Sequence, residues 1–299
     1  MTVPIHEHAK RFSRVKRTIT YGLDPEVVIY DIASHRWTGP PVTIGMISDL
    51  HMISPWTPMR ALRNIVLRMN RMQLDLVFVL GDFIAARSTP GTRMSPTEVA
   101  GTLADLEAAH GVYTVMGNHD WSDDDTACSN GFIESSVARA LRDVNLNPLM
   151  NESRCLDIAG HALWLVGMDS QRGHLPPNGG GARHDPDRAF AGVPQGAASI
   201  LLAHEPDYFV CGDDRPLLQV SGHTHGGQAN FWGWRPFTPS EYADRYAYGH
   251  VVEDGRHLIV SGGLGYTHIP LRIMQPPEIT LIRLTSGVAG QAVIERSDL

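Results

Sequence analysis

Five short polar clusters hold the residues of this chain that could bind a metal ion and move a proton, and each directly follows an apolar run. The clusters are Ser48-Asp49-Leu50-His51, Gly81-Asp82, Gly117-Asn118-His119-Asp120, His204-Glu205-Pro206-Asp207 and Gly222-His223-Thr224-His225-Gly226-Gly227. Carboxylate and carboxamide oxygens mixed with imidazole nitrogens suit borderline or hard divalent ions such as Mn, Fe, Zn or Co. The sequence therefore predicts a metal site.

The donors in these clusters are too many for a single ion. Seven residues qualify, and they are Asp49, His51, Asp82, Asn118, His204, His223 and His225. Divided over two ions, with one carboxylate bridging, they leave open positions for water and substrate. Two metals about 3.5–4 Å apart stabilise both the attacking and the leaving oxygen of an in-line displacement at phosphorus. The donor set therefore predicts hydrolysis of a phosphate ester.

Taken singly, most of these residues have an ordinary structural explanation. An aspartate at a strand end, such as Asp49 or Asp82, commonly caps a helix or forms a turn. A lone histidine such as His204 is commonly hydrogen-bonded inside a fold. The pair His223-x-His225 is harder to explain in this way, because it follows a buried strand and is enclosed by glycines. The prediction rests on the whole set in its order along the chain.

The apolar runs that precede the clusters predict the strands that must position them. These runs are Val42–Ser48, Leu74–Leu80, Val112–Met116, Leu163–Gly167, Ser199–Ala203 and Leu217–Ser221, with helices predicted over Pro58–Met72 and Ser95–His110. Near-continuous apolar strands separated by helices indicate an α/β fold whose sheet is covered on both faces and mostly parallel at its centre. In such sheets the carboxyl ends of the strands form the ligand crevice.

Segments later in the chain predict a more antiparallel section, over Tyr246–Val252, His257–Gly262 and Glu278–Leu284. Residues 41–299 are predicted to form one domain. The first 40 residues do not follow the alternation of strand and helix, and they predict an N-terminal arm or an edge element. Asp123-Asp124-Asp125 lacks the alternating oxygen ligands of a calcium loop and predicts a solvated turn.

Composition limits the partners of the chain. With 25 basic and 32 acidic side chains among 299 residues, the formal charge is −7, so the protein has no general electrostatic attraction for nucleic acid or anionic membrane. Bound phosphate then needs local positive charge, which metal ions could supply.

Three scattered cysteines without metal-ligand spacing indicate a reducing compartment, and we expect a cytoplasmic protein.

The five clusters, in this order, resemble the five motifs of the calcineurin-like metallophosphoesterase superfamily, over about residues 43–284. The segments after them resemble a bacterial branch of phosphodiesterase-like phosphohydrolases. Those segments are Gly222–Gln228, Thr238–Ser240, Arg245–Gly249, Gly263–Gly265, Pro270–Arg272 and Pro276–Ile279. The resemblance implies a layered α/β/β/α sandwich of mixed sheets with the metal site at the carboxyl ends of the strands. Some relatives act on lipid-linked substrates, including the diacylated UDP-glucosamine of lipid A synthesis.

The resemblance also implies a role for each matching residue. One ion would be held by Asp49, His51, Asp82 and His225, and the other by Asp82, Asn118, His204 and His223, with Asp82 bridging. His119 would act as general acid near the leaving-group oxygen, and Asp120 would orient His119. The implied cofactors are two divalent metal ions, with Mn preferred over Fe, Zn, Co or Mg.

We therefore expect a phosphodiester or phosphomonoester to be hydrolysed by a metal-bridging hydroxide, on a small, lipid-linked or nucleotide-linked substrate. A cyclic-nucleotide or nucleotide phosphodiesterase is the alternative enzyme, and a metal-holding scaffold without turnover is the alternative from another class. A nuclease is less favoured, because the chain is acidic and has no long basic stripe.

Related proteins often begin with a membrane anchor or an export signal. Here a basic cluster (Lys10, Arg11, Arg14, Lys16, Arg17) predicts a solvated arm or, at most, peripheral contact with the inner membrane face.

The segment from Phe231 to Phe237 contains four aromatic residues directly after the last cluster. One interpretation is that they cover a sheet edge as part of the core. The other is that Trp232 and Trp234 lie at the rim of the metal site and contact the apolar or aromatic part of a substrate, because Gly233 and Pro236 prevent a regular strand.

Overall fold

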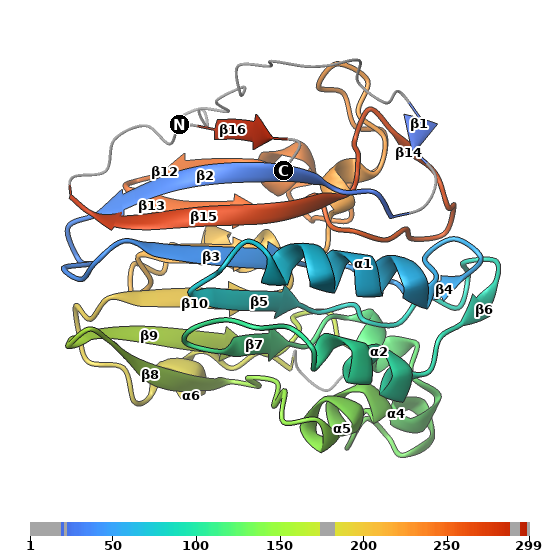
Figure 1. The fold of residues 1–299 in the computed structure, drawn as a ribbon, viewed down its shortest axis with the longest axis horizontal. Helices are drawn as coiled ribbons and strands as arrows, with labels where there is room; N and C mark the ends of the chain where they lie inside the picture. The colour runs from blue at the N-terminus through green and yellow to red at the C-terminus, as the bar shows by residue number, and fades with distance from the viewer. Residues whose placement is uncertain (1–18, 21–22, 174–182, 288–293, 298–299) are drawn as a thin grey trace.

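Two six-stranded sheets form the centre of the protein in a computed structural model, which describes residues 19–20, 23–173, 183–287 and 294–297. The strand order in the first sheet is β16-β2-β15-β3-β5-β7, and in the second it is β12-β13-β11-β10-β9-β8. The second sheet lies behind the first in Figure 1. The first-sheet strands are β2 (Glu26–Ser34), β3 (Val42–Ile47), β5 (Leu76–Leu80), β7 (Val112–Val115), β15 (Glu278–Ser286) and β16 (Ile294–Ser297). The second-sheet strands are β8 (Glu152–Ile158), β9 (His161–Met168), β10 (Ser199–Ala203), β11 (Leu218–Ser221), β12 (Gly249–Glu253) and β13 (Arg256–Val260).

Helices cover the outer face of each sheet, so that the layers are α/β/β/α as expected. The helices α1, α2 and α5 pack on the first sheet, and α6 packs on the second (Figure 1). The helices are α1 (Met59–Asn70), α2 (Pro96–Leu103), α3 (His119–Ser122), α4 (Asp125–Ser129), α5 (Ser136–Asp143) and α6 (Pro186–Phe190). The described residues also form four two-residue strands, β1 (Ile19–Thr20), β4 (Ile53–Ser54), β6 (Thr92–Arg93) and β14 (Arg272–Ile273), and three 3-10 helices, η1 (Pro206–Cys211), η2 (His225–Gly227) and η3 (Ala243–Tyr246).

The strand β5 shows why its sequence is apolar without alternation. Val77 and Val79 face the helix layer, whereas Leu76, Phe78 and Leu80 face the second sheet, and none of the five side chains is exposed. Successive side chains of a strand point to opposite faces, so a strand buried on both faces is apolar at every position. The core between the sheets also contains Ile200 and Leu202 of β10.

Strand directions match the prediction in part. In the second sheet β9, β10, β11 and β13 are parallel, and β12 and β13 form the expected antiparallel pair. In the first sheet, however, β15 lies between β2 and β3, parallel to β2 and antiparallel to β3. The centre of that sheet is therefore mixed. The late strand β15 thus pairs with two early strands of the chain. Local sequence patterns do not specify such long-range pairing.

The boundary predicted at residue 40 also differs from the structure. Within residues 1–40, predicted as an arm or an edge element, β2 is an inner strand that pairs with β15 on one side and β16 on the other. Residues 27–30 are all buried, with Val27 and Ile29 on the helix side and Val28 and Tyr30 in the core between the sheets. The basic cluster at residues 10–17 lies outside the described residues. Helix α2 ends at Leu103, earlier than predicted, and the chain continues through turns.

Within the described residues, no helix is both long and apolar enough to span a membrane.

Candidate metal centre

The carboxyl ends of five strands, three from the first sheet and two from the second, bring the predicted metal ligands together. Asp49 and His51 follow β3, Asp82 follows β5, and Asn118 follows β7. From the second sheet, His204 follows β10, while His223 and His225 follow β11. Two groups made up of predicted ligands alone have ligand atoms within 4.8 Å of one another: Asp49, His51 and His225 form one, and Asp82, His204 and His223 form the other.

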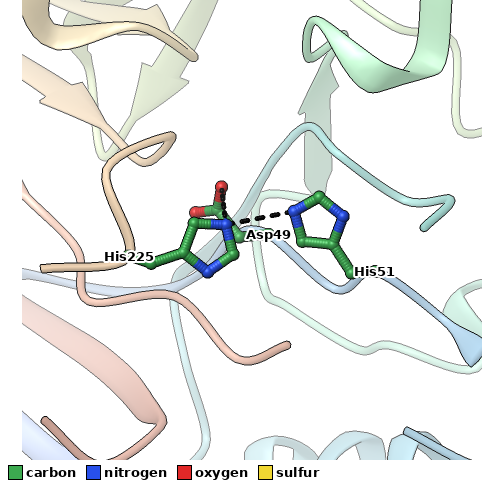
Figure 2. A group of neighbouring side chains, drawn as sticks. All are labelled: Asp49, His51 and His225. Atoms are coloured by element: carbon green, nitrogen blue, oxygen red, sulfur yellow. Dashed lines mark hydrogen bonds and ion pairs between the residues drawn. The ribbon is translucent and has the colours of Figure 1, made fainter. Parts of the chain in front are cut away.

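The first group is centred on His225. Its Nε2 lies 3.1 Å from Nε2 of His51 and 3.5 Å from Oδ1 of Asp49. Figure 2 shows one ring nitrogen of His225 directed toward both Asp49 and His51. All three residues are buried. Two imidazoles and one carboxylate directed at a common point are suited to a divalent cation.

Asp82 connects the two groups. Its Oδ2 lies 3.5 Å from Nε2 of His51 and 3.2 Å from Nε2 of His204, which come from different sheets. Its Oδ1 accepts a hydrogen bond of 2.9 Å from the backbone N–H of His119. One carboxylate oxygen is therefore fixed by the backbone, while the other faces an imidazole of each group. A carboxylate in this position could bridge two ions.

Several buried polar atoms at this centre have no hydrogen-bond partner. They include Oδ2 of Asp82, Oδ1 of Asn118 and Nε2 of His204. The 3.2 Å contact between Asp82 and His204 lies within ion-pair range but does not have hydrogen-bond geometry. Unpaired buried polar atoms are costly and uncommon in folded proteins. Unpaired atoms of this kind among buried carboxylates and imidazoles fit a site that holds cations.

The outward nitrogen of three histidines is engaged by a backbone carbonyl. The Nδ1 of His51 donates to the carbonyl of Ile84 at 3.2 Å, and Nδ1 of His204 donates to that of Leu80 at 2.5 Å. His223 has the opposite ring orientation, because its Nε2 donates to the carbonyl of Pro239 at 3.1 Å. Such hydrogen bonds fix the tautomer and direct the other nitrogen at the metal.

His225 has a different support. Its Nδ1 lies 3.2 Å from Nη2 of Arg272, an arginine that is completely buried. Arg272 also donates to the carbonyls of Gly262 at 2.7 Å and Gly265 at 2.6 Å. Burial lowers the pKa of Arg272 to about 10, so the guanidinium is still charged at neutral pH. A buried cation of this kind is stabilised by the carbonyl dipoles and by nearby carboxylates such as Asp49.

The backbone is unusual at five of the seven predicted ligands. Asp49, His51, Asp82, His223 and His225 all have positive φ, between 41° and 69°. This left-handed region is uncommon for residues other than glycine, and it is typical of functional sites where surrounding structure fixes a strained conformation.

Close approach of glycines allows the carboxylates to reach their positions. A Cβ added to Gly117 would lie 2.3 Å from Oδ1 of Asp82, and one added to Gly222 would lie 2.6 Å from Oδ2 of Asp49. Neither contact is compatible with a side chain, so these positions require glycine.

Burial and mutual charge shift the pKa values at the centre in different directions. Burial raises the pKa of Asp49 to about 6 and lowers that of His51 and of His223 to about 3. Burial also opposes the charged form of His204, but the charge of Asp82 outweighs it and raises the pKa of His204 well above its usual value. Without a metal, the centre therefore holds a proton at His204 near neutral pH. Displacement of such protons accompanies metal binding.

His119 lies beside the two groups at the start of α3. Its ring is 5.1 Å from that of His51, and it could join His51 and Asp82 around an ion. Its Nδ1, however, donates to Oδ2 of Asp123 at 2.5 Å. Burial lowers the pKa of His119, but Asp82 and then Asp123 outweigh this effect and raise it. This environment favours a charged, proton-donating imidazole.

The carboxylate in contact with the ring of His119 is Asp123, whereas the sequence suggested Asp120 as the residue that could orient this ring. Asp120 accepts hydrogen bonds from the backbone N–H groups of Asp82 at 2.8 Å, Phe83 at 2.8 Å and Gly117 at 2.9 Å. It is completely buried and joins the turns after β5 and β7. The sequence predicts a solvated turn at Asp123. The four-residue spacing from His119 would have indicated the contact only if α3 had been predicted.

The aromatic segment is exposed, so the interpretation as core is wrong. Trp232, Trp234 and Phe237 have exposed fractions of 83%, 65% and 80%. Phe231 and Trp234 exchange backbone hydrogen bonds of 2.9 and 3.2 Å, which place Trp232 and Gly233 at the tip of a tight hairpin. The segment remains close to the centre, because Nε of Arg235 donates to the carbonyl of Gly226 at 3.0 Å.

Comparisons with known proteins agree with this site. A sequence model of the family described as calcineurin-like phosphoesterase matches residues 42–227, which include all seven predicted ligands. The uncharacterised metallophosphoesterase YkuE of Bacillus subtilis is 31% identical over 245 residues, covering 81% of this chain and 79% of that protein. The phosphodiesterase YaeI of Escherichia coli is 24% identical over 262 residues, covering 87% of this chain and 88% of that protein.

A third relative is longer. A transmembrane protein with a metallophosphoesterase domain from Bos taurus is 28% identical over 283 residues, which cover 88% of this chain but only 58% of that protein.

Proposed function

Because the chain belongs to the calcineurin-like phosphoesterase family, we propose that it hydrolyses a phosphate ester with two divalent metal ions bound at the centre described above. The observation that carries this proposal is the position of Asp82. One of its carboxylate oxygens lies within 3.5 Å of an imidazole from each ligand group and has no hydrogen bond of its own. A single cation would leave one of the two groups unused.

The ligand sets follow from the two groups and from the family resemblance. One ion would be held by Asp49, His51, Asp82 and His225, and the other by Asp82, Asn118, His204 and His223. When bound, two such ions lower the pKa of a bound water and neutralise charge on the phosphoryl oxygens. The backbone hydrogen bonds behind His51, His204 and His223 keep the rings in the orientation that this chemistry needs.

His119 would supply the proton that the departing alcohol requires. Its Nδ1 is held by Asp123, which leaves Nε2–H as the donor. Asp82 holds the backbone N–H of the same residue, so that the imidazole is fixed at both the main chain and the ring. General acid catalysis of this kind contributes about 10²- to 10⁴-fold to a rate.

The finer assignments are part of the same proposal. The mixed oxygen and nitrogen donors support Mn, with Fe, Zn, Co or Mg as alternatives. The exposed Trp232 and Trp234 support a substrate with an apolar or aromatic part, either lipid-linked or nucleotide-linked. Cys155 and Cys211 are exposed free thiols, which supports a reducing compartment such as the cytoplasm.

Metal analysis combined with a turnover screen tests the proposal. Bis-p-nitrophenyl phosphate, p-nitrophenyl phosphate, cyclic nucleotides and a UDP-linked lipid should be offered to the Mn-loaded protein. We expect close to two ions per chain and hydrolysis of at least one ester. Asp82→Asn should lose metal as well as rate, whereas His119→Ala should lose rate alone. Full activity with one ion or none would contradict the two-metal assignment.

A further inference from the structure

Two arginines contact the two histidines of the His223-x-His225 pair, and they differ in their access to solvent. Arg272, behind His225, is completely buried, and its donors are directed at carbonyls and at the ring. Arg172 lies beside His223, with Nη1 3.4 Å from Nε2 of the imidazole, and its side chain is exposed. Of these two cations, only Arg172 can reach a molecule that enters from solvent.

Glu205 fixes the main chain that carries Arg172. This carboxylate is only 1% exposed, although it follows His204 directly. It accepts hydrogen bonds from the hydroxyl of Ser170, from the backbone N–H of Gln171 at 2.9 Å and from that of Arg172 at 3.2 Å. A buried carboxylate satisfied by three donors of one short segment makes that segment a rigid part of the site.

Asp207 fixes the segment on the other side of the guanidinium. It accepts the hydroxyl of Ser240 at 2.5 Å and the backbone N–H of Glu241 at 3.0 Å. The carbonyl of Pro239, next in the chain, accepts a hydrogen bond from Nη1 of Arg172 and another from Nε2 of His223.

Both acids belong to the cluster His204-Glu205-Pro206-Asp207, so one motif provides an imidazole for the metal centre and two carboxylates that position Arg172. The metal-ligand assignments give no role to these carboxylates.

The chemistry of this arrangement favours an oxyanion as the ligand. A guanidinium has five N–H donors, and the side-chain hydrogen bond described above goes from Nη1 to the carbonyl of Pro239. The 3.4 Å contact with Nε2 of His223 is not a hydrogen bond from Arg172, because that nitrogen donates to the same carbonyl. Its planar fork matches the oxygens of phosphate. The protein carries a formal charge of −7, so a phosphate ester is not attracted to it in general. Arg172 lies beside the outward nitrogen of His223, so this exposed cation supplies attraction one imidazole ring away from the proposed ions.

We propose that Arg172 is a substrate-binding residue that donates hydrogen bonds to a non-bridging phosphoryl oxygen of the ester. The proposal rests on the function inferred above and deepens it, because it assigns the binding of the phosphoryl group to a side chain of this protein in addition to the metals. It also gives Glu205 and Asp207 a role as positioning residues.

Binding of inorganic phosphate to the Mn-loaded protein, measured by isothermal titration calorimetry, tests this assignment without turnover. The variants are Arg172→Met, which retains the bulk but removes the charge, and Arg172→Lys, which keeps a point charge. Arg154→Met is the matched control, since Arg154 is also exposed and, among the described residues, pairs only with Glu152 on the edge strand β8. Metal content and melting temperature are measured for every variant.

We expect Arg172→Met to bind phosphate about tenfold to a hundredfold more weakly, the range for loss of a charge-assisted hydrogen bond. Arg172→Lys should be intermediate, and Arg154→Met unchanged. Both Arg172 variants should keep their metals. Unchanged phosphate affinity in Arg172→Met, equal weakening in Arg154→Met, loss of metal from Arg172→Met, or no phosphate binding by the parent protein would each overturn the proposal.

Kinetics separate this inference from the proposed function. If the parent protein hydrolyses an ester, Arg172→Met should raise KM more than it lowers kcat, because the contact is made in the bound ester as well as in the transition state. An unchanged KM would refute the role of Arg172 and leave the hydrolase intact. If phosphate binding depends on Arg172 but no ester is turned over, the proposed function fails instead.

Discussion

His119 donates its Nδ1 proton to Asp123 one helical turn later, at 2.5 Å, and both residues belong to the short segment that begins with α3. The other carboxylate oxygen of Asp123 accepts the backbone N–H of Arg87 at 3.0 Å. Burial opposes the charge on Asp123, but the hydrogen bonds from His119 and Arg87 outweigh it and hold its pKa below the usual value. The carboxylate is therefore ionised and held from two sides.

Replacing Asp123 with Asn should impair catalysis without removing the metals. A neutral amide stabilises a charged imidazole less than a carboxylate does, so we expect kcat to fall by about 10²-fold for a substrate with a poor leaving group. The effect should be smaller for p-nitrophenolate, which departs without much help from an acid. Asp125→Asn is the control, because Asp125 is 78% exposed and its ion pairs within the described part of the chain are with Arg87 and Arg93 alone.

The same variant should shift the pH profile. Asp123 raises the pKa of His119, and a general acid is lost as pH rises through its pKa. In Asp123→Asn the decline of kcat on the alkaline side should therefore occur at lower pH than in the parent protein. An alkaline limb at the same pH in both proteins would show that Asp123 does not act through His119.

Two glycines offer a matched test of the packing at the centre. A Cβ on Gly117 would meet Oδ1 of Asp82 at 2.3 Å, so Gly117→Ala should displace the carboxylate, weaken metal binding and destabilise the fold by roughly 1–3 kcal/mol. A Cβ on Gly101, within α2, would have no atom within 4 Å. Gly101→Ala should stabilise the protein by about 0.5–1 kcal/mol. Urea denaturation measures the free energy of unfolding, and metal analysis measures the metal content. Equal stability and equal metal content in the two variants would contradict this prediction.

Metal affinity should fall as the solution becomes more acidic. In the metal-free centre the pKa of His204 is raised well above its usual value, and that of Asp49 is raised to about 6. A raised pKa means that protons compete with the metal below it, so affinity for Mn should decrease from pH 8 to pH 5.

Calorimetry in buffers with different ionisation enthalpies should also detect protons released on binding. Chelation at pH 8 should lower the melting temperature, because a ligand at a hundred times its Kd stabilises the native state by about 2.7 kcal/mol. Affinity independent of pH, with no proton release, would contradict the protonated state described for His204.

The aromatic hairpin should affect binding of large substrates and not stability. Trp232 and Trp234 are 83% and 65% exposed, so Trp232→Ala with Trp234→Ala should change the free energy of unfolding by no more than about 0.5 kcal/mol. We expect KM to rise for a lipid-linked or nucleotide-linked ester and to stay constant for p-nitrophenyl phosphate. Ile133→Ala, at an 84% exposed position, is the control. Parallel loss with both classes of ester would exclude a specific contact.

The sequence predicted the inner strands and the approach of the metal ligands well, for a physical reason. A strand such as β5 is buried on both faces, so its apolar run is continuous, and the change to Gly81-Asp82 marks its end clearly. Five such strand ends, together with the resemblance to a known family, were sufficient to predict that Asp49 and His225 lie close together, although they are far apart in the chain.

Contacts that depend on short helices or on long-range pairing were not predictable in this way. Asp123 reaches His119 only because α3 places them one turn apart, and a four-residue helix has no periodic signal. The position of β15 between β2 and β3 depends on which strands remain unpaired, which no local pattern specifies. Glu205 lies beside a predicted ligand, but its hydrogen bonds to residues 170–172 depend on how two loops meet.

Each of the two ligand groups takes residues from both sheets. Asp49 and His51 of the first sheet meet His225 of the second, and Asp82 of the first meets His204 of the second. An apolar core also lies between the sheets, and the attraction that it supplies is not directional. Bound ions would add directional bonds across that interface, since coordination distances tolerate only a few tenths of an ångström. The cofactor would then determine the relative position of the two halves of the molecule as well as the chemistry, and metal occupancy would report whether the halves are correctly docked.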